Sequence, residues 1–251
     1  MKTDILCEVL YRETPEAEVD RALTLFFEKL RLFEKTYSRF RDDNDLWELN
    51  HSESIVVTKD FSLLLRCAQF FFHQTKGVFD PSVLSYLEKE GYQSQVYVAE
   101  HLGHESFVDL SLNVTTNEVT KPLHLSLDIG GFGKGYIVDH LALFLSKTFQ
   151  HFLIDAGGDI YAFGQNTVAG YPYWAVEVEN PVQQKAPLIL MLSNMAVATS
   201  GITRRFWQKD GEEKHHLIDT ATGKSATTKL LSVSVIAPST VSADVLAKTL
   251  F

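Results

Sequence analysis

The sequence has little cysteine, no surplus of positive charge and no long apolar run, and each shortage excludes a class of protein. Two cysteines, Cys7 and Cys67, are too few for a disulfide framework, and neither has a metal-ligating neighbour at the usual spacing. The 23 lysines and arginines face 32 aspartates and glutamates, and this net charge of −9 argues against binding nucleic acid. No apolar stretch reaches the ~18 residues of a transmembrane helix, and the N-terminus lacks the apolar region of a secretory signal.

What remains is the composition of an ordinary globular protein. The 251 residues are 45% apolar and 22% charged, which is sufficient for a full hydrophobic core. We therefore expect a cytoplasmic chain as the sequence is given, although a membrane-anchored or exported parent protein would have the same composition. We expect neither a nucleic-acid partner nor a transmembrane segment.

The spacing of apolar residues predicts helices first and strands later in the chain. Helices are expected over residues 15–38, 59–75, 81–87, 136–145 and 242–251, with Pro81 in the first turn of the third. Strands are expected over residues 106–110, 118–127, 152–154, 174–178, 187–192, 196–199 and 231–236. No repeat or linker interrupts residues 1–251, so we predict a single domain of the α+β class, with mixed sheets and helices and with room for two lobes.

A glycine-rich turn is the strongest local signal for chemistry. Residues 127–139, LDIGGFGKGYIVD, join an expected strand to an expected helix through four glycines, with Asp128 before the turn and Lys134 at the helix start. Glycine lets a phosphate approach the backbone closely, and a helix N-terminus and a lysine both attract anions. The spacing is neither that of a Walker A loop nor that of a dinucleotide fingerprint. The segment is either a phosphate-binding turn or a purely structural one.

Two further turns have a structural and a functional interpretation. Gly157 and Gly158 follow an expected strand, where they form a tight turn or let the backbone approach a bound nucleotide. Asp80 stands directly before Pro81, where it would cap a helix or contribute an acid to a site.

Two candidates for acid/base or metal chemistry lie near the C-terminus. His216 with Asp219, in a turn that ends at Gly223, is an acid/base candidate, and His215 would be its neighbour on the solvent side. Asp244 near the start of the last helix is either a cap or a hard oxygen ligand of the kind that Mg²⁺ prefers.

In this order, the segments together resemble the ApbE family of FAD:protein FMN transferases. Residues 36–50, TYSRFRDDNDLWELN, are similar to the family's early segment, and Gly77–Pro81 is similar to its GAFDP turn. Asp128–Asp139 is similar to the family signature DLGGIAKGYAVD. Residues 156–160, 198–201, 216–223 and 232–244 match later segments, so that the resemblance runs from about residue 30 to residue 251.

The resemblance implies two mixed α+β lobes with FAD in a cleft between them. FAD would be the substrate, and FMN would pass from it to a serine or threonine hydroxyl of an acceptor flavoprotein, with release of AMP. His216 or a nearby aspartate, Asp219, would take the hydroxyl proton, with His216 as our choice, and Mg²⁺ would be held by Asp244 and the backbone carbonyl of Gly131. The residues assigned to FAD are Phe40 beside the isoalloxazine ring, Val78, Phe79, Asp80, Asp128, Lys134, Gly157, Gly158, Thr199, Ser200, Gly201 and Ile218.

The chain departs from the family in length at both ends and at Lys248. The family usually has threonine or a small residue there, and Lys248 shares a helix face with Asp244, so it belongs to the proposed metal site. Its ammonium points either into the phosphate site, where it would supply positive charge without a metal, or to solvent, which we expect because a long lysine side chain can place its charged end in water. Two other interpretations stay open, an FAD pyrophosphatase that releases FMN and AMP, and an FAD-binding protein without turnover in which Lys248 has replaced the metal.

Overall fold

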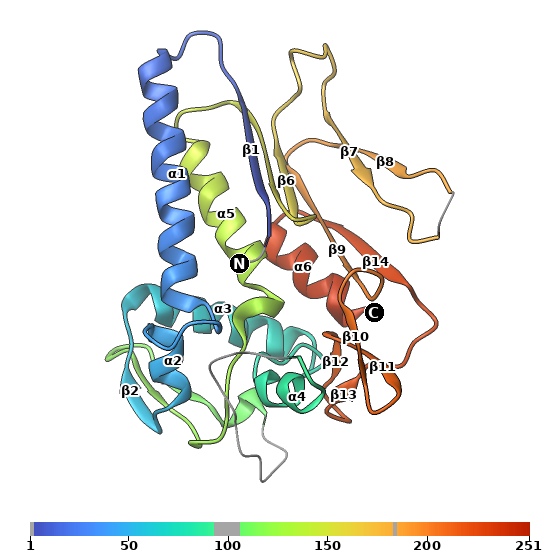
Figure 1. Cartoon of the computed structure of the whole chain (residues 1–251). Coiled ribbons are helices and arrows are strands. Elements are labelled where there is room, and N and C mark those ends of the chain that lie inside the picture. The colour runs from blue at the N-terminus through green and yellow to red at the C-terminus, as the bar shows by residue number, and fades with distance from the viewer. Residues whose placement is uncertain (1–2, 93–105, 183–184) are drawn as a thin grey trace. The chain divides into compact units, whose positions relative to one another are not determined.

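The computed structural model describes residues 3–92, 106–182 and 185–251 (Figure 1). The chain forms two compact units. The first unit comprises residues 1–34, 132–200 and 230–251, and the second comprises residues 35–131 and 201–229. Within the described residues, none of the helices is long and apolar enough to cross a bilayer.

The first unit is built on a five-stranded sheet of order β1-β5-β6-β9-β14. Its strands are β1 (Ile5–Leu10), β5 (His151–Ala156), β6 (Ile160–Phe163), β9 (Met195–Gly201) and β14 (Ser232–Ala237). Along β5 burial alternates, as expected for a strand with one face in a core, and Phe152, Ile154 and Ala156 are fully buried. A hairpin of β7 (Trp174–Val178) and β8 (Leu188–Leu192) packs on this sheet through Trp174, Val176 and Leu192.

Three helices complete the first unit: α1 (Glu16–Tyr37), α5 (Gly133–Leu145) and α6 (Thr240–Thr249). The apolar stripe of α1 predicted from the sequence, with Val19, Phe26 and Leu30, is buried against α5 and β5. The helix α5, which begins where the glycine-rich turn ends, therefore packs against α1 and β5 of the same unit.

In the described part of the second unit, short elements surround α3 (Lys59–Gln74), a helix with one buried face. Thr58 caps α3 by accepting a hydrogen bond from the Phe61 N–H, and Phe61, Leu64 and Leu65 are buried. The unit's other helices are α2 (Asp45–Asn50) and α4 (Leu84–Lys89), with single 3₁₀ turns at Phe107–Asp109 and Ile129–Gly131. Its strands are β2 (Ser54–Val56), β4 (Glu118–Thr120) and β3 (Ser111–Asn113) in one sheet, and the pairs β10 (Phe206–Lys209) with β11 (Glu212–His215) and β12 (Ile218–Asp219) with β13 (Lys224–Ser225).

The α+β class is confirmed, and the helices predicted over residues 15–38, 59–75, 136–145 and 242–251 are present as α1, α3, α5 and α6. The helix expected to begin at Pro81 begins instead at Leu84, because the Asp80 carboxylate accepts a hydrogen bond from the Ser82 N–H and holds a turn there. The strand expected over residues 106–110 is wrong, since Phe107–Asp109 forms a 3₁₀ turn. The strand expected over residues 118–127 ends at Thr120, just before Lys121-Pro122.

Candidate functional site

The glycine-rich turn crosses from the second unit into the first between Gly131 and Phe132. In the second unit, one carboxylate oxygen of Asp128 accepts a hydrogen bond from the Gly130 N–H at 2.9 Å and holds the 3₁₀ turn. The other oxygen lies 4.0 Å from Nε of Arg39, and both side chains are buried. Asp128, predicted to contact FAD, is therefore also the partner of a buried guanidinium.

In the first unit, Gly135 permits a contact between two helix backbones. A Cβ atom at Gly135 would lie 2.6 Å from Cα of Val241 and 2.7 Å from the carbonyl oxygen of Thr240, so α5 and α6 touch at this point. The Asp139 carboxylate strengthens the contact by accepting hydrogen bonds from the Thr240 and Val241 N–H groups, at 2.6 and 3.0 Å. This glycine of the motif therefore has a structural task.

We expect Gly135→Ala to lower the free energy of unfolding by about 1–3 kcal/mol, because the added methyl group must push two helix backbones apart. Urea denaturation of the purified protein measures the change. Leu143→Ala on the exposed side of α5 is the matched control and should change stability by less than about 0.5 kcal/mol. A Gly135→Ala protein as stable as the wild type would show that α5 and α6 can separate here without cost.

Two ion pairs lie at the α5–α6 contact in the first unit. Lys134 at the start of α5 pairs with Asp159, and Lys248 on α6 pairs with Asp244. Both carboxylates are buried, with side chains 3% and 2% exposed, while the lysine side chains are 16% and 21% exposed. Burial, together with the nearby Asp244 carboxylate, raises the pKa of Asp159 to about 6, and both lysines oppose that rise. The four groups thus form one electrostatic cluster.

Asp159 is the member of this cluster that the sequence analysis missed. It follows Gly157-Gly158 directly, and both glycines have positive φ angles, of 67° and 97°, which other residues rarely adopt. The Gly158 N–H donates a 2.7 Å hydrogen bond to the Asp155 carboxylate. The two glycines therefore form the tight turn that was one of the two interpretations. The turn places Asp159 beside Lys134. The approach of a nucleotide to the same backbone stays a prediction.

The expectation that Lys248 points to solvent is wrong. Its ammonium contacts the Asp244 carboxylate, because the four-residue spacing stacks the two side chains and a buried carboxylate favours a cation over water. The second oxygen of Asp244 accepts a 3.4 Å hydrogen bond from the Gly135 N–H. Asp244 does not cap α6, since that task falls to Ser239, which accepts a hydrogen bond from the Ser242 N–H.

These contacts decide how well the chain's residues fit Mg²⁺. The cation needs open carboxylate or carbonyl oxygens, but Lys248 and the Gly135 N–H take both oxygens of Asp244. Across the described parts of the chain, no group of three or more acidic, histidine or cysteine side chains gathers as a metal site would require. Gly131, the other predicted ligand, belongs to the second unit. In this arrangement the donors of the first unit do not fit Mg²⁺.

The predicted FAD residues on the turn before α4 have different exposures. Val78 is 53% exposed, whereas Phe79 is buried and packs near Gly131. The Asp80 carboxylate accepts hydrogen bonds from the Ser106 hydroxyl at 2.7 Å and from the Phe107 N–H. Asp80 therefore holds this loop to the turn at residue 107, and its contact with FAD stays a prediction.

Of the two neighbouring histidines, His215 is buried and His216 is half-buried. His215, expected on the solvent side, is buried, with Nε2 2.9 Å from the Ala226 carbonyl oxygen and Nδ1 3.3 Å from the Leu217 backbone nitrogen. Burial lowers its pKa, so His215 is a neutral structural residue. The expectation was wrong because the last residue of β11 turns its side chain into the unit.

His216 and Asp219, the predicted acid/base pair, are both half-buried in the second unit. The His216 ring lies with its centroid 6.5 Å from that of Tyr92. The Asp219 carboxylate accepts hydrogen bonds from the Ala221 N–H at 2.9 Å and from the Thr222 hydroxyl at 3.0 Å. Asp219 thus organises its own turn, which leaves His216 as the stronger acid/base candidate.

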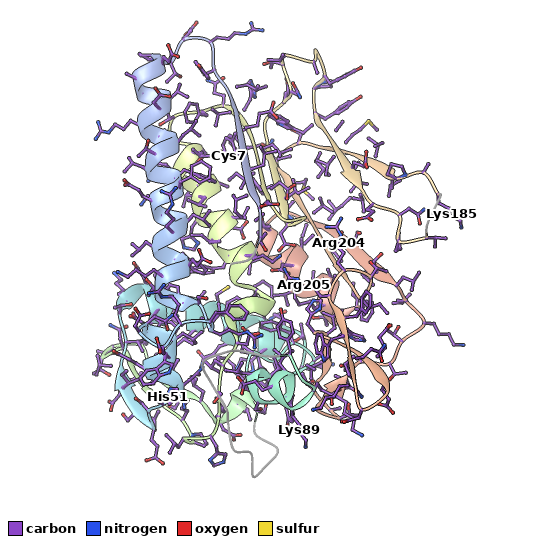
Figure 2. All side chains as sticks on the ribbon, viewed as in Figure 1. Cys7, His51, Lys89, Lys185, Arg204 and Arg205 are labelled. Atoms are coloured by element: carbon purple, nitrogen blue, oxygen red, sulfur yellow. The ribbon has the colours of Figure 1, made fainter. Side chains whose placement is uncertain are left out.

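The remaining predicted residues lie on strands or at strand ends. Thr199 and Ser200 are on β9, where the Thr199 hydroxyl lies 2.8 Å from that of Ser234, and Gly201 ends the strand. Ile218 begins β12. Arg204 and Arg205, which follow Gly201 in the chain, are exposed ahead of β10 (Figure 2).

Neither Cys7 nor Cys67 forms a disulfide. Cys7 on β1 (Figure 2) packs against the core of the first unit, and burial raises the pKa of its thiol to about 12. At neutral pH Cys7 is therefore protonated and does not act as a nucleophile.

Comparisons with known proteins agree along the whole chain. The sequence profile of the ApbE family matches residues 1–251. A Treponema pallidum FAD:protein FMN transferase is 31% identical over 273 residues, covering 98% of this chain and 75% of the relative. A Haemophilus influenzae protein of the same name is 26% identical, covering 85% and 67%. Among solved structures, the flavin transferase ApbE from Vibrio cholerae superimposes with a TM-score of 0.84 at 23% identity, covering 100% of this chain and 83% of the other.

Proposed function

The chain belongs to the ApbE family, and from this membership we infer that it is a transferase that moves FMN from FAD onto an acceptor protein. The match to FAD:protein FMN transferases along 98% of the chain carries the inference. The start of α5 supports it, because Lys134 stands in the first turn of that helix, where an anion is favoured by both the side chain and the helix N-terminus.

The reaction is a phosphoryl-group transfer. The oxygen of a serine or threonine hydroxyl on the acceptor flavoprotein attacks the phosphorus atom of the FMN half, and the pyrophosphate bond to AMP breaks. Negative charge develops on the AMP leaving group and on the transferred phosphoryl group. We assign Lys134 to stabilise that charge, since its ammonium lies at the helix N-terminus in a mostly buried setting.

The acceptor hydroxyl must lose its proton as it attacks. We assign His216 as the base, because imidazole is the side chain that most often serves as a general base and His216 is only half-buried in the second unit. Asp219 is assigned to the turn at residues 219–223 and not to proton transfer, since its oxygens accept hydrogen bonds from Ala221 and Thr222 there.

Phe40 is assigned to the flavin ring, and its side chain is 44% exposed, which leaves an aromatic face open to a ligand. The resemblance implies Mg²⁺ as a cofactor, which would neutralise the pyrophosphate when bound. In this chain we assign part of the neutralisation of the pyrophosphate charge to Lys248, whose ammonium forms an ion pair with Asp244. The other residues assigned to FAD remain part of the proposal: Val78, Phe79, Asp80, Asp128, Gly157, Gly158, Thr199, Ser200, Gly201 and Ile218.

We expect AMP to appear when the purified protein is mixed with FAD and a flavoprotein acceptor that carries the target hydroxyl. The acceptor should gain the mass of one FMN less water for each AMP released, and omitting it should slow AMP release at least tenfold. Chromatography of the nucleotides and mass spectrometry of the acceptor measure both.

Three results would contradict the transferase. Equal AMP release without the acceptor would identify an FAD pyrophosphatase. Bound FAD without AMP would identify a flavin-binding protein. An acceptor whose target residue is changed to alanine is the control, and modification of that variant would contradict transfer to the hydroxyl.

A further inference from the structure

Arg39 is a buried cation whose terminal nitrogen atoms have no hydrogen-bond partner among the described residues. Its side chain is only 4% exposed. The guanidinium carbon lies 4.8 Å from the centre of the Phe40 ring and 4.5 Å from that of Tyr92. The Tyr92 ring in turn stacks on Trp207, with centroids 5.1 Å apart. The guanidinium is therefore one layer of an aromatic stack within the second unit.

The charge of Arg39 is balanced, but its donors are not satisfied. The carboxylate of Asp128 lies 4.0 Å from Nε, close enough for electrostatic attraction and too far for a hydrogen bond. Nη1 and Nη2 are buried and carry four N–H donors, which cost free energy when they lack acceptors. Buried polar groups in native proteins almost always have a hydrogen-bond partner, so these two nitrogens call for an acceptor such as a water molecule or a ligand.

The missing partner must offer two neighbouring acceptors in one plane, because the guanidinium is a rigid planar fork. A phosphate could do so, but it would also lie close to the Asp128 carboxylate and be repelled by it. A neutral aromatic heterocycle avoids that repulsion and extends the stack of Phe40 and Tyr92. The isoalloxazine ring has two such edges, each with a carbonyl oxygen beside a ring nitrogen.

We propose that Arg39 binds the flavin ring of FAD, by donating two hydrogen bonds from Nη1 and Nη2 to a carbonyl oxygen and the adjacent ring nitrogen. This proposal rests on the function proposed above and adds to it the residue that recognises the ring. Phe40 is 44% exposed in the turn after α1, so its ring can shift to admit the ligand beside the guanidinium without unpacking the core.

The test compares binding of FAD and of ADP to the wild type and to Arg39→Lys. Lysine keeps the positive charge beside Asp128 but removes the planar fork. We expect Arg39→Lys to weaken FAD binding about tenfold or more and to leave ADP, which shares only the adenosine and phosphates, within about twofold. Arg41→Lys is the matched control, since Arg41 is exposed and its guanidinium is bound to Asp43, and it should change neither affinity.

Flavins with sulfur in place of one carbonyl oxygen test the same contact in the unaltered protein. Sulfur is a weaker acceptor, so either the 2-thio or the 4-thio analogue of FAD should bind wild type several-fold more weakly and thereby identify the edge. Unchanged FAD affinity in Arg39→Lys, an equal loss for ADP, or full affinity for both thio analogues would overturn the proposal. If wild type transfers FMN in any of these cases, only the role of Arg39 fails; if it binds no flavin, the proposed function fails.

Discussion

Replacement of Lys134 by methionine is expected to slow AMP release from FAD by about 100- to 1,000-fold, with FAD affinity changed by less than about tenfold. The loss corresponds to removing one preorganised charge from a group on which negative charge develops in the transition state. Ground-state affinity should change less, because in the proposed binding mode most contacts with FAD would be to its rings and sugars rather than to the phosphate that reacts. Single-turnover assays with saturating FAD separate the two quantities.

Because Lys134 forms an ion pair with Asp159, a second variant is needed to separate the effect on stability from the effect on the rate. Without Lys134, the buried Asp159 carboxylate loses a partner that lowers its pKa, so the pKa of this group rises further above its usual range and the carboxyl takes up a proton near neutral pH. A Lys134→Met protein should therefore be less stable than the wild type. Adding Asp159→Asn removes the unpaired acid and should restore the stability but not the rate.

Lys147→Met is the matched control, because Lys147 is exposed just after the C-terminal end of the same helix. Its rate should equal that of the wild type. A Lys134→Met protein that releases AMP within fivefold of the wild-type rate would remove Lys134 from the reaction and with it the assigned phosphate site at the start of α5.

Replacement of Lys248 by threonine is expected to create a Mg²⁺ site that the wild type lacks. In the wild type the ammonium of Lys248 occupies Asp244, so calorimetry should detect no tight Mg²⁺ binding and EDTA should leave most of the activity. Threonine removes that ammonium and frees an oxygen of Asp244 near the Asp159 carboxylate, and Mg²⁺ is often held by one or two carboxylates together with waters and substrate phosphates. The variant should bind Mg²⁺ and lose activity by about 100-fold or more in EDTA.

Stability gives a readout that does not depend on turnover. Lys248→Thr leaves Asp244 buried, without its cation and close to Asp159, so the metal-free variant should melt at a lower temperature than the wild type. Added Mg²⁺ should raise the melting temperature of the variant and not that of the wild type. The double variant Lys248→Thr/Asp244→Asn should lose this response. Tight Mg²⁺ binding and complete EDTA inhibition of the wild type would show that the metal displaces Lys248 from Asp244.

Local patterns in the sequence were sufficient for much of the architecture. The apolar stripe of α1 predicted both its position and its buried face, because a helix repeats every 3.6 residues whatever it packs against. The glycine-rich turn between Asp128 and Lys134 was recognised because only glycine tolerates such close backbone approach. The ordered series of segments was sufficient to identify the family, which the match over residues 1–251 confirmed.

The side-chain partners of the site were decided by tertiary structure alone. Lys134 and Asp159 are 25 residues apart, and no local period relates them; the sheet and the positive φ angles of the Gly157-Gly158 turn bring them together. The same holds for Arg39 and Asp128, which belong to distant segments of the second unit.

Lys248 separates what the sequence determined from what only the tertiary structure decided. The sequence determined that Lys248 and Asp244 share a helix face, because they are four residues apart. It did not determine whether the ammonium faces water or the carboxylate. That depends on the burial of Asp244, which the contact between α5 and α6 at Gly135 produces, since a carboxylate removed from water holds the nearest cation.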